Sequence, residues 1–388
     1  MTLRIGISAL HSASGGSLTH LAHLLADWKR DGTLARHRFV IFAGPDSDAA
    51  LRDAVPDIAD DVEIVLFPDA GRGLVRRLID EQIRLPRALK KHSIDVLLCP
   101  ANVMPYATEV PVVASFQNAA PFCETVTPSS VGMRAWLQFV LLGWFMRATA
   151  RKATIVIFIS KFFRDLFVER FGFEAERGRV IPRAAEDPGI TANPELEKRL
   201  GVQRPFLISV SHLNPYKNTV ELIEGFAVAS KDLPPRQLVL AGEAYFPQYA
   251  ATIRETIRRH GLEERVLLTG NLPHADALAL VAGSEGFVFT STCENCPTAL
   301  VEAMSVGAPV ASSNVGVMPE VTGDAALLFD PARPAEIADA LRRMMSDPQL
   351  REDLRRRAVA RAQTFITRDT AARQTIDAIE IASRRKPA

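Results

Sequence analysis

Short apolar runs alternate with amphipathic stretches along almost the whole chain. In the first half, the apolar runs predict strands at residues 4–9, 39–43, 62–67, 96–99, 112–116 and 155–159. In the second half, they predict strands at residues 206–210, 237–241, 266–269, 286–289, 309–312 and 326–328. Between them, helical periodicity occurs at residues 17–30, 73–92, 219–229, 249–260, 276–282, 298–306, 334–345 and 349–364. Strands that alternate with helices form parallel sheets with crossover helices, so the sequence predicts an α/β fold.

The length of the chain predicts two domains, because 388 residues are enough for two hydrophobic cores. We expect one Rossmann-like domain over residues 1–185 and a second over 201–365, facing each other across a cleft, with a linker at 183–200. A helix near residues 366–388 is expected to pack back on the first domain. Ligands of open parallel sheets bind at the carboxyl ends of the strands, so the cleft is the predicted site.

Composition narrows the class of protein. Hydrophobic residues make up 47% and charged residues 23%, and the net charge of +1 gives no sign of a nucleic-acid-binding protein. Four cysteines are too few for a disulfide scaffold, so we expect reduced thiols and a cytoplasmic location. No uninterrupted apolar segment reaches the ~20 residues that a membrane span requires.

The segment CENCPTALVEAMSVGAPV places two carboxylates, Glu294 and Glu302, eight residues apart. Pro297 suits the first turn of a helix and Gly307 a helix end, so Glu294 is expected in a loop and Glu302 about one turn inside the helix. The first turn of that helix favours an anion. Two carboxylates beside an anion site suit a nucleotide sugar, with its diphosphate and many hydroxyl groups. The alternative is an ordinary strand–loop–helix unit with two solvated glutamates.

Two further segments could contact phosphate. Gly15 and Gly16 follow the first predicted strand and open a helix, although a plain turn explains them too. Lys217 lies in the segment SHLNPYKN after the first strand of the second half, where an ammonium group can neutralise phosphate. A solvated loop lysine is the alternative for Lys217.

These segments resemble a known family. The strings SVSHLNPYKNTVELIEGF, VLAGE, RVLLTGNLP, CENCPTALVEAMSVGAPV and SSNVGVMPEVTGDAALLFDP occur in the order typical of the family, over residues 206–331. They resemble the donor-binding domain of glycosyltransferase family 4 (glycosyl transferases group 1), retaining enzymes of the GT-B fold. The first half is similar more loosely, through Gly15-Gly16 and VPVVASFQNAAPF.

The resemblance implies roles for residues around the donor. Lys217 would be catalytic by binding the diphosphate and stabilising the leaving group, and Glu294 would be catalytic by holding hydroxyls of the transferred sugar. Glu302 would accept hydrogen bonds from the ribose. Further contacts are implied as follows: His212, Gly15 and Gly16 to the phosphates; Asn271, Leu272, Thr298, Leu300 and Val301 to the nucleotide; Asn295, Cys296 and Pro297 to the sugar. Neither a metal nor another cofactor is implied.

The sequence departs from the family pattern at three places. His212 stands where the family usually has an arginine, so phosphate binding loses a fixed charge. Gln117 and Asn118 replace a His-Asp pair, and because a glutamine cannot act as a general base, they are expected to position the acceptor or the sugar. The residues after Glu294 differ from the usual glycine-rich stretch and indicate a subtype.

By resemblance, we expect a retaining hexosyltransferase that moves a hexose from a nucleotide-diphosphate sugar to a glycan or lipid-linked acceptor, in cell-surface polysaccharide or lipopolysaccharide synthesis. A non-catalytic GT-B-like protein that binds a nucleotide or glycan is the alternative, because of the changes at positions 117 and 212.

Three other segments have competing interpretations. Cys293-x2-Cys296 lacks the second pair that a zinc site needs. Asp46-x-Asp48 could suggest metal-binding carboxylates but suits a turn and helix start. Residues 134–152 are apolar with basic ends, and we favour a buried helix over a peripheral contact with the inner face of a membrane.

Overall fold

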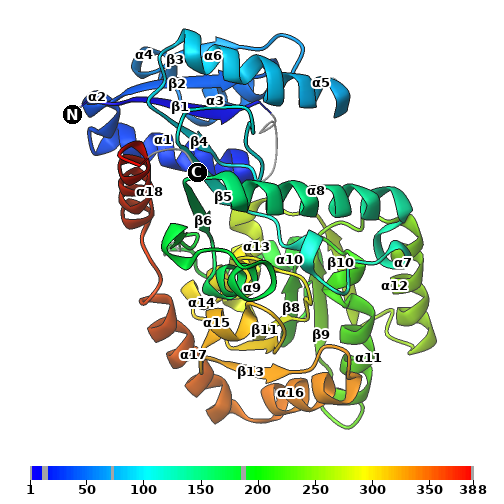
Figure 1. Cartoon of the computed structure of the whole chain (residues 1–388). Helices are drawn as coiled ribbons and strands as arrows, with labels where there is room; N and C mark the ends of the chain where they lie inside the picture. Colours follow the sequence, from blue (N-terminus) through cyan, green and yellow to red (C-terminus); the bar gives the residue numbers. More distant parts are fainter. Residues whose placement is uncertain (1, 11–15, 71–73, 185–188, 386–388) are drawn as a thin grey trace. The chain divides into compact units, whose positions relative to one another are not determined.

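The computed structural model describes residues 2–10, 16–70, 74–184 and 189–385. Contacts divide the chain into two compact units (Figure 1). Unit 1 comprises Met1–Ala119, Val140–Ala184 and Ile366–Ala388, and unit 2 comprises Ala120–Phe139 and Ala185–Phe365. Gly15 lies outside the described residues, and Gly16 begins helix α1 (Gly16–Arg30).

Unit 1 contains a parallel sheet of seven strands in the order β3-β2-β1-β4-β5-β6-β7. Its strands are β1 (Arg4–Ala9), β2 (Arg38–Ala43), β3 (Glu63–Leu66), β4 (Val96–Cys99), β5 (Val112–Phe116), β6 (Ile155–Phe158) and β7 (Gly178–Val180). The six predicted strands are confirmed, and the apolar residues of all but the edge strand β3 are mostly buried in the sheet. The edge strand β7 was not predicted, since its three residues include a glycine and an arginine.

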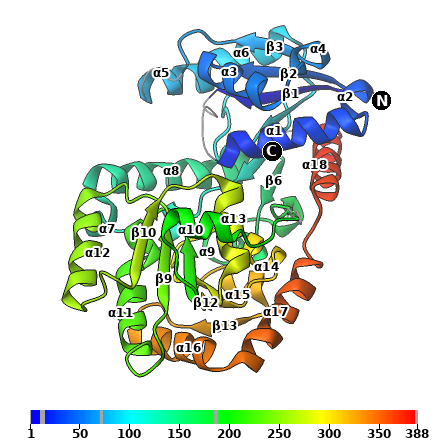
Figure 2. The same cartoon turned by 180° about the vertical axis from the view of Figure 1, so that it is seen from behind.

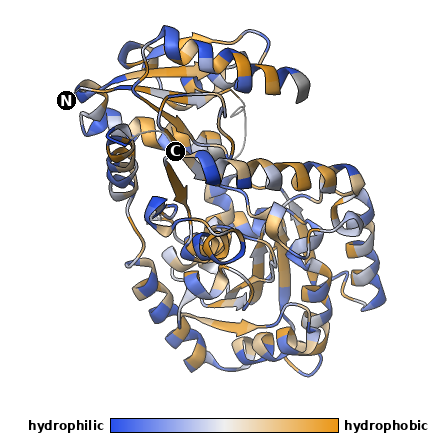
Figure 3. Ribbon diagram, in the orientation of Figure 1, coloured by the Kyte–Doolittle hydropathy of each residue, from blue (hydrophilic) through white to orange (hydrophobic). Residues whose placement is uncertain are grey.

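Unit 2 contains a parallel sheet of six strands in the order β10-β9-β8-β11-β12-β13. Its strands are β8 (Phe206–Val210), β9 (Gln237–Ala241), β10 (Val266–Gly270), β11 (Gly286–Phe289), β12 (Val310–Ser313) and β13 (Ala326–Phe329). Figure 3 shows that these strands are mostly hydrophobic. Helices cover both faces, so β8, β9 and β11 are almost continuously buried, as expected for parallel sheets.

Helices connect the strands as predicted, with small shifts at their ends. The other helices of unit 1 are α2 (Thr33–Arg36), α3 (Pro45–Ala54), α4 (Ile58–Asp61), α5 (Leu74–Ile79), the π-helical turn η1 (Asp80–Arg84), α6 (Leu85–Lys91), α9 (Lys161–Phe171), the 3-10 turn η3 (Ala175–Arg177) and α18 (Arg368–Ser383). Asp46 and Asp48 lie in the first turn of α3, as the helix-start interpretation predicted. Helix α8 (Met133–Lys152) begins in unit 2 and continues into unit 1.

Unit 2 contains longer helices, which pack in two layers on its sheet, and shorter helices and turns in the segment before α8 and in its loops. They are the 3-10 turns η2 (Ala120–Phe122) and η4 (Pro215–Lys217), with α7 (Pro128–Val131), α10 (Pro194–Leu200), α11 (Thr219–Ala229), α12 (Pro247–Arg259), α13 (His274–Gly283), α14 (Thr298–Ser305), α15 (Met318–Thr322), α16 (Pro334–Ser346) and α17 (Pro348–Ala362). One core contains Phe226 of α11 and Leu341 of α16, and the other contains Leu280 of α13 and Met304 of α14. Figure 2 shows α10 and α13 from behind. The predicted linker at 183–200 ends in α10, whose Asn193 cap accepts a hydrogen bond from Leu196 N.

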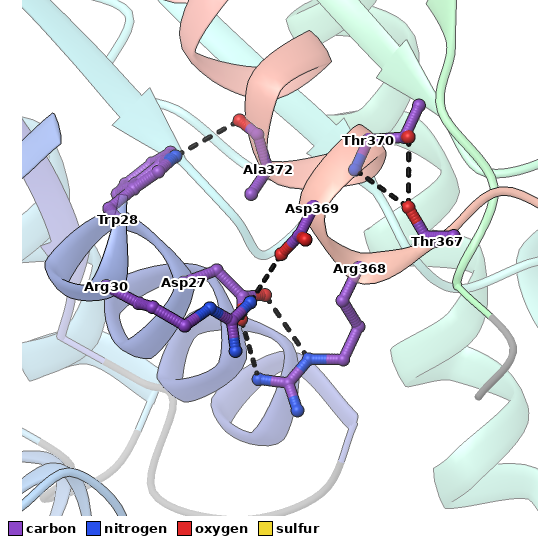
Figure 4. Close-up of polar contacts among 8 residues, drawn as sticks. All are labelled: Asp27, Trp28, Arg30, Thr367, Arg368, Asp369, Thr370 and Ala372. Carbon is purple, nitrogen blue, oxygen red and sulfur yellow. Dashed lines mark hydrogen bonds and ion pairs between the residues drawn. The ribbon is translucent and has the colours of Figure 1, made fainter. Parts of the chain in front are cut away.

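The C-terminal helix α18 packs on α1 within unit 1 (Figure 4). Trp28 Nε1 donates a hydrogen bond to Ala372 O at 3.1 Å, and Arg368 Nη2 lies 3.1 Å from Asp27 Oδ1. Ile379 is fully buried in the same core. The chain therefore completes the core of its first unit with its last helix.

A disulfide joins Cys123 to Cys293 within unit 2, across 170 residues of sequence. The expectation that all the cysteines are reduced is wrong for this pair. No spacing rule relates residues so far apart in the chain, so no sequence pattern indicated that they lie close together. Cys293 packs in a small cluster with Val126 and Val131, which fastens the segment before α8 to the loop after β11.

Replacing Ile379 with alanine should reduce the free energy of unfolding by about 2–5 kcal/mol, because it leaves a cavity in the core of unit 1. The surface variant Arg373→Ala on the same helix is the control and should change stability by less than about 0.5 kcal/mol. Urea unfolding measures both. Equal stability of the two variants would show that α18 is not part of this core.

The disulfide predicts that protein denatured without reductant will have two cysteines protected from alkylation, as measured by mass spectrometry. Cys123→Ser should lower the melting temperature, because a disulfide typically contributes about 2–4 kcal/mol, whereas Cys296→Ser should leave the linkage intact. Alkylation of all four cysteines in the wild-type protein would contradict the linkage.

Candidate functional site

The order of strands in unit 2 brings two loops together at one edge of the sheet. From β8 the chain passes to β9 and β10 on one side and then returns to β11 on the other side of β8. The loops that follow β8 and β11 therefore begin side by side at the carboxyl edge of the sheet, and the chain then continues from them in opposite directions. Such a switch point is where open α/β sheets bind ligands. Lys217 comes from the first loop and Glu294 from the second.

Lys217 and Glu294 form a direct ion pair. The Lys217 side chain is 15% exposed and that of Glu294 is 14% exposed, so solvent screens the pair only weakly. Lys217 Nζ lies 5.3 Å from the centroid of the Phe289 ring and 5.7 Å from that of Tyr216. The structure thus contains a sheltered ammonium group whose charge is balanced by one carboxylate.

Hydrogen bonds hold the two loops in place. Thr290 Oγ1 donates to Lys217 O at 2.6 Å, and Thr292 N donates to Tyr216 O at 2.9 Å. Thr292 Oγ1 also donates to Thr125 Oγ1 at 2.9 Å, beside the disulfide. The positions of Lys217 and Glu294 therefore depend on hydrogen bonds to the main chain of the first loop as well as on their ion pair.

Glu302 lies on α14, as predicted, and Glu294 lies in the loop before it. The side chain of Glu302 is 23% exposed and contacts His274 Nε2 at 2.9 Å. Glu294 and Glu302 therefore have different partners, a lysine and a histidine. His274, the first residue of α13, was not among the predicted site residues, because a single histidine outside a motif carries no sequence signal.

Two main-chain N–H groups in the first turn of α14 already have hydrogen-bond partners. Leu300 N and Val301 N both donate to Pro297 O, at 3.0 and 3.1 Å, and both side chains are buried in the core of unit 2. Asn295 is buried too, whereas Thr298 and Cys296 are half-buried. The side chains of Leu300 and Val301 thus pack α14 against the core of unit 2.

Asn271 and Leu272 follow β10. Asn271 Nδ2 donates to Glu243 Oε2 at 2.9 Å, and Leu272 packs against the core. Gly242 directly follows β9 and has a φ of +140°, and a Cβ there would lie 1.9 Å from Ser211 O. A glycine is therefore required where the loops after β9 and β8 meet.

His212 is only partly covered, and its ring lies against that of Tyr245 in a tilted arrangement with centroids 4.9 Å apart. Partial burial and the positive charge of Lys217 lower the pKa of His212 from its ordinary value of 6.5. His212 is therefore neutral at neutral pH and can donate only one hydrogen bond, in contrast to an arginine.

In unit 1, Gln117 and Asn118 follow β5, and both main-chain N–H groups donate to Asn102 Oδ1, at 2.7 and 3.1 Å. The Gln117 side chain donates to Ser115 Oγ at 2.6 Å and accepts from Arg183 Nη2 at 3.0 Å. Arg183 and Asn102 were not predicted, because neither belongs to a recognisable motif. Arg183 brings a positive charge to the position where the family usually has a His-Asp pair.

Family comparisons agree with this architecture. The model for "Glycosyltransferase Family 4" matches residues 14–186, and the model for "Glycosyl transferases group 1" matches residues 194–361. The structure is similar to that of HepE from Anabaena in complex with UDP-glucose, with a TM-score of 0.73, 22% identity and coverage of 98% of this chain and 100% of HepE. It is also similar to WaaG, a glycosyltransferase of lipopolysaccharide biosynthesis, with a TM-score of 0.70, 16% identity and coverage of 97% and 99%.

Curated relatives match at low identity. The O-antigen chain mannosyltransferase B of Escherichia coli is 27% identical over 59% of this chain and 61% of that protein. The alpha-D-kanosaminyltransferase of Streptomyces kanamyceticus is 27% identical over 54% of this chain and 55% of that protein. The aligned part thus spans somewhat more than half of each relative. With two Rossmann-like parallel-sheet domains matched by these two family models, the chain belongs to the GT-B glycosyltransferases of group 1.

Proposed function

We propose that this protein transfers a hexosyl group from a nucleotide-diphosphate sugar to a glycan or lipid-linked acceptor, with retention of anomeric configuration. The observation that carries the proposal is the sheltered Lys217–Glu294 pair at the switch point of the unit 2 sheet. A cation and an acceptor-only carboxylate side by side match the two chemical halves of such a donor, its diphosphate and its sugar hydroxyls.

Binding of the donor would rearrange this pair. The diphosphate would take over hydrogen bonds from the Lys217 ammonium, which has three N–H donors and can serve phosphate and carboxylate together. Glu294, released in part from the ammonium, would accept hydrogen bonds from hydroxyls of the sugar. Because both side chains are mostly shielded from water, each interaction would be stronger than at an open surface.

In the transfer step, the bond between the anomeric carbon and the phosphate oxygen breaks, and the acceptor oxygen bonds to the same face of that carbon. The proton of the acceptor hydroxyl passes to the departing diphosphate, since Gln117 cannot act as a base. Lys217 and amide groups near the start of α14 would stabilise the charge that develops on the diphosphate, so we propose a reaction without a metal ion.

Other predicted residues would bind the nucleotide. Glu302, whose present partner is His274, would accept hydrogen bonds from the ribose. Asn271 and Leu272 would lie at the edge of the base. His212 would donate one hydrogen bond to phosphate in its neutral form, a weaker contact than an arginine would make.

The relatives support a surface-glycan substrate. One is named for mannosyl transfer to an O-antigen chain, and a structurally similar protein acts in lipopolysaccharide biosynthesis. We therefore propose a role in cell-surface polysaccharide or lipopolysaccharide synthesis. A thermal-shift screen against GDP, UDP and ADP sugars would identify the donor for the assays below.

A non-catalytic glycan- or nucleotide-binding protein is the second candidate. The observation in its favour is that both polar atoms of the Gln117 side-chain amide are engaged: Nε2 donates to Ser115, and Oε1 accepts from Arg183. Sugar transfer or donor hydrolysis by the wild-type protein, absent from the Lys217 variant, decides in favour of the enzyme.

Glu294→Ala should abolish transfer and leave the affinity for the free nucleoside diphosphate unchanged or slightly higher, because Lys217 loses a competing carboxylate. Glu302→Ala should instead weaken nucleotide binding by about tenfold, as the loss of charge-assisted hydrogen bonds would. Isothermal titration calorimetry and a transfer assay measure both. Glu224→Gln, which alters a surface pair with Arg259, is the matched control. Equal nucleotide affinity in both site variants would contradict these assignments.

Lys217→Ala should reduce the turnover number by about 10²–10³, the usual cost of removing a preorganised group that stabilises developing charge. Lys217→Arg should restore part of the activity because it restores the charge. Turnover close to that of the wild type in Lys217→Ala would show that this side chain does not act on the leaving group.

A further inference from the structure

Helix α8 presents an apolar face to solvent. Met133, Leu137, Val140, Leu141 and Trp144 are each between 38% and 58% exposed. Their spacing of three and four residues puts them on one side of the helix. Figure 3 shows hydrophobic residues recurring along α8. Isolated exposed apolar residues are ordinary, whereas a continuous row of five marks a surface that binds something.

The opposite side of α8 makes the packing contacts. Gly143, Met146, Thr149 and Ala150 are buried. The favoured expectation of a buried core helix at 134–152 is therefore wrong for the side that carries Trp144. The number of apolar residues in this segment did not show that only some of them would be buried and that the others would face solvent.

The same helix is basic. It has no acidic residue and carries Arg134, Arg147, Arg151 and Lys152, although the whole chain has a net charge of only +1. Among the described residues, the structure gives none of these four a carboxylate partner. Trp144, Arg147, Ala148 and Arg151 line a surface depression of about 270 Å³, which places two guanidinium groups beside an exposed indole.

We propose that this face of α8 docks on the surface of an anionic lipid bilayer. The apolar row would enter the boundary between headgroups and acyl chains, with the helix lying in the plane of the membrane. Trp144 would sit at the headgroup level, and Arg147 and Arg151 would bind lipid phosphates at the depression. Within the described part of the chain, no helix is long and apolar enough to cross a membrane.

Charge favours a bilayer over a second copy of the chain. A symmetric dimer would place the same basic helix on both sides of one interface, with eight positive charges and no acidic residue from either helix. An anionic membrane supplies the negative charge that this helix lacks. This docking does not depend on the proposed sugar transfer, although a lipid-linked acceptor would be located at such a surface.

The test is co-sedimentation of the full chain with vesicles of phosphatidylcholine and with vesicles that also contain phosphatidylglycerol. The wild-type protein should bind the anionic vesicles, and high salt should weaken binding. The double variant Leu137→Ser/Trp144→Ser should bind at least about tenfold more weakly because two apolar side chains are lost. Arg134→Gln/Arg151→Gln should also lose about tenfold, and only on anionic vesicles.

The control variants are Val228→Ser, an exposed apolar residue of α11, and Lys231→Gln, an exposed lysine just beyond it; both should bind vesicles like the wild type. Far-UV circular dichroism checks that every variant is folded. Three results would overturn the proposal: no preference for anionic vesicles, complete displacement by inorganic phosphate, or self-association of the wild type that Leu137→Ser/Trp144→Ser abolishes.

Discussion

The ion pair between Lys217 and Glu294 is the interaction on which the proposed chemistry of the candidate site depends. It joins the loops after β8 and β11, where the strand order of unit 2 reverses direction. A buried or half-buried pair contributes little to stability, because removing two charges from water costs about as much as their attraction returns. We propose that its role is chemical, since it keeps a cation and a carboxylate side by side where a parallel sheet binds ligands.

The surroundings of the pair explain why both side chains have defined positions. Hydrogen bonds to the main chain link the two loops, and the Cys123–Cys293 disulfide fastens the residue before Glu294 to the segment that precedes α8. Gly242 allows the neighbouring loop to approach within a distance that no side chain would permit. The site is thus built from backbone contacts first, and the charged side chains are added to a frame that does not rely on them.

The sequence predicted what depends on local pattern. Parallel strands are buried on both faces, so their apolar runs stand out, and helix α14 could be placed because Pro297 and Gly307 mark its ends. It could not predict contacts between distant residues, such as the disulfide, the Arg183–Gln117 hydrogen bond or the His274–Glu302 contact. It also failed for α8, because composition does not show which side of an apolar helix finds a partner.

A crystal structure of the protein soaked with the donor chosen by thermal-shift screening would show whether Lys217 and Glu294 bind the two halves of the donor. We expect Lys217 Nζ to lie about 2.7–2.9 Å from a diphosphate oxygen and Glu294 to accept a hydrogen bond from a hydroxyl of the sugar. A bound donor that leaves the Lys217–Glu294 pair intact and contacts neither residue would contradict it.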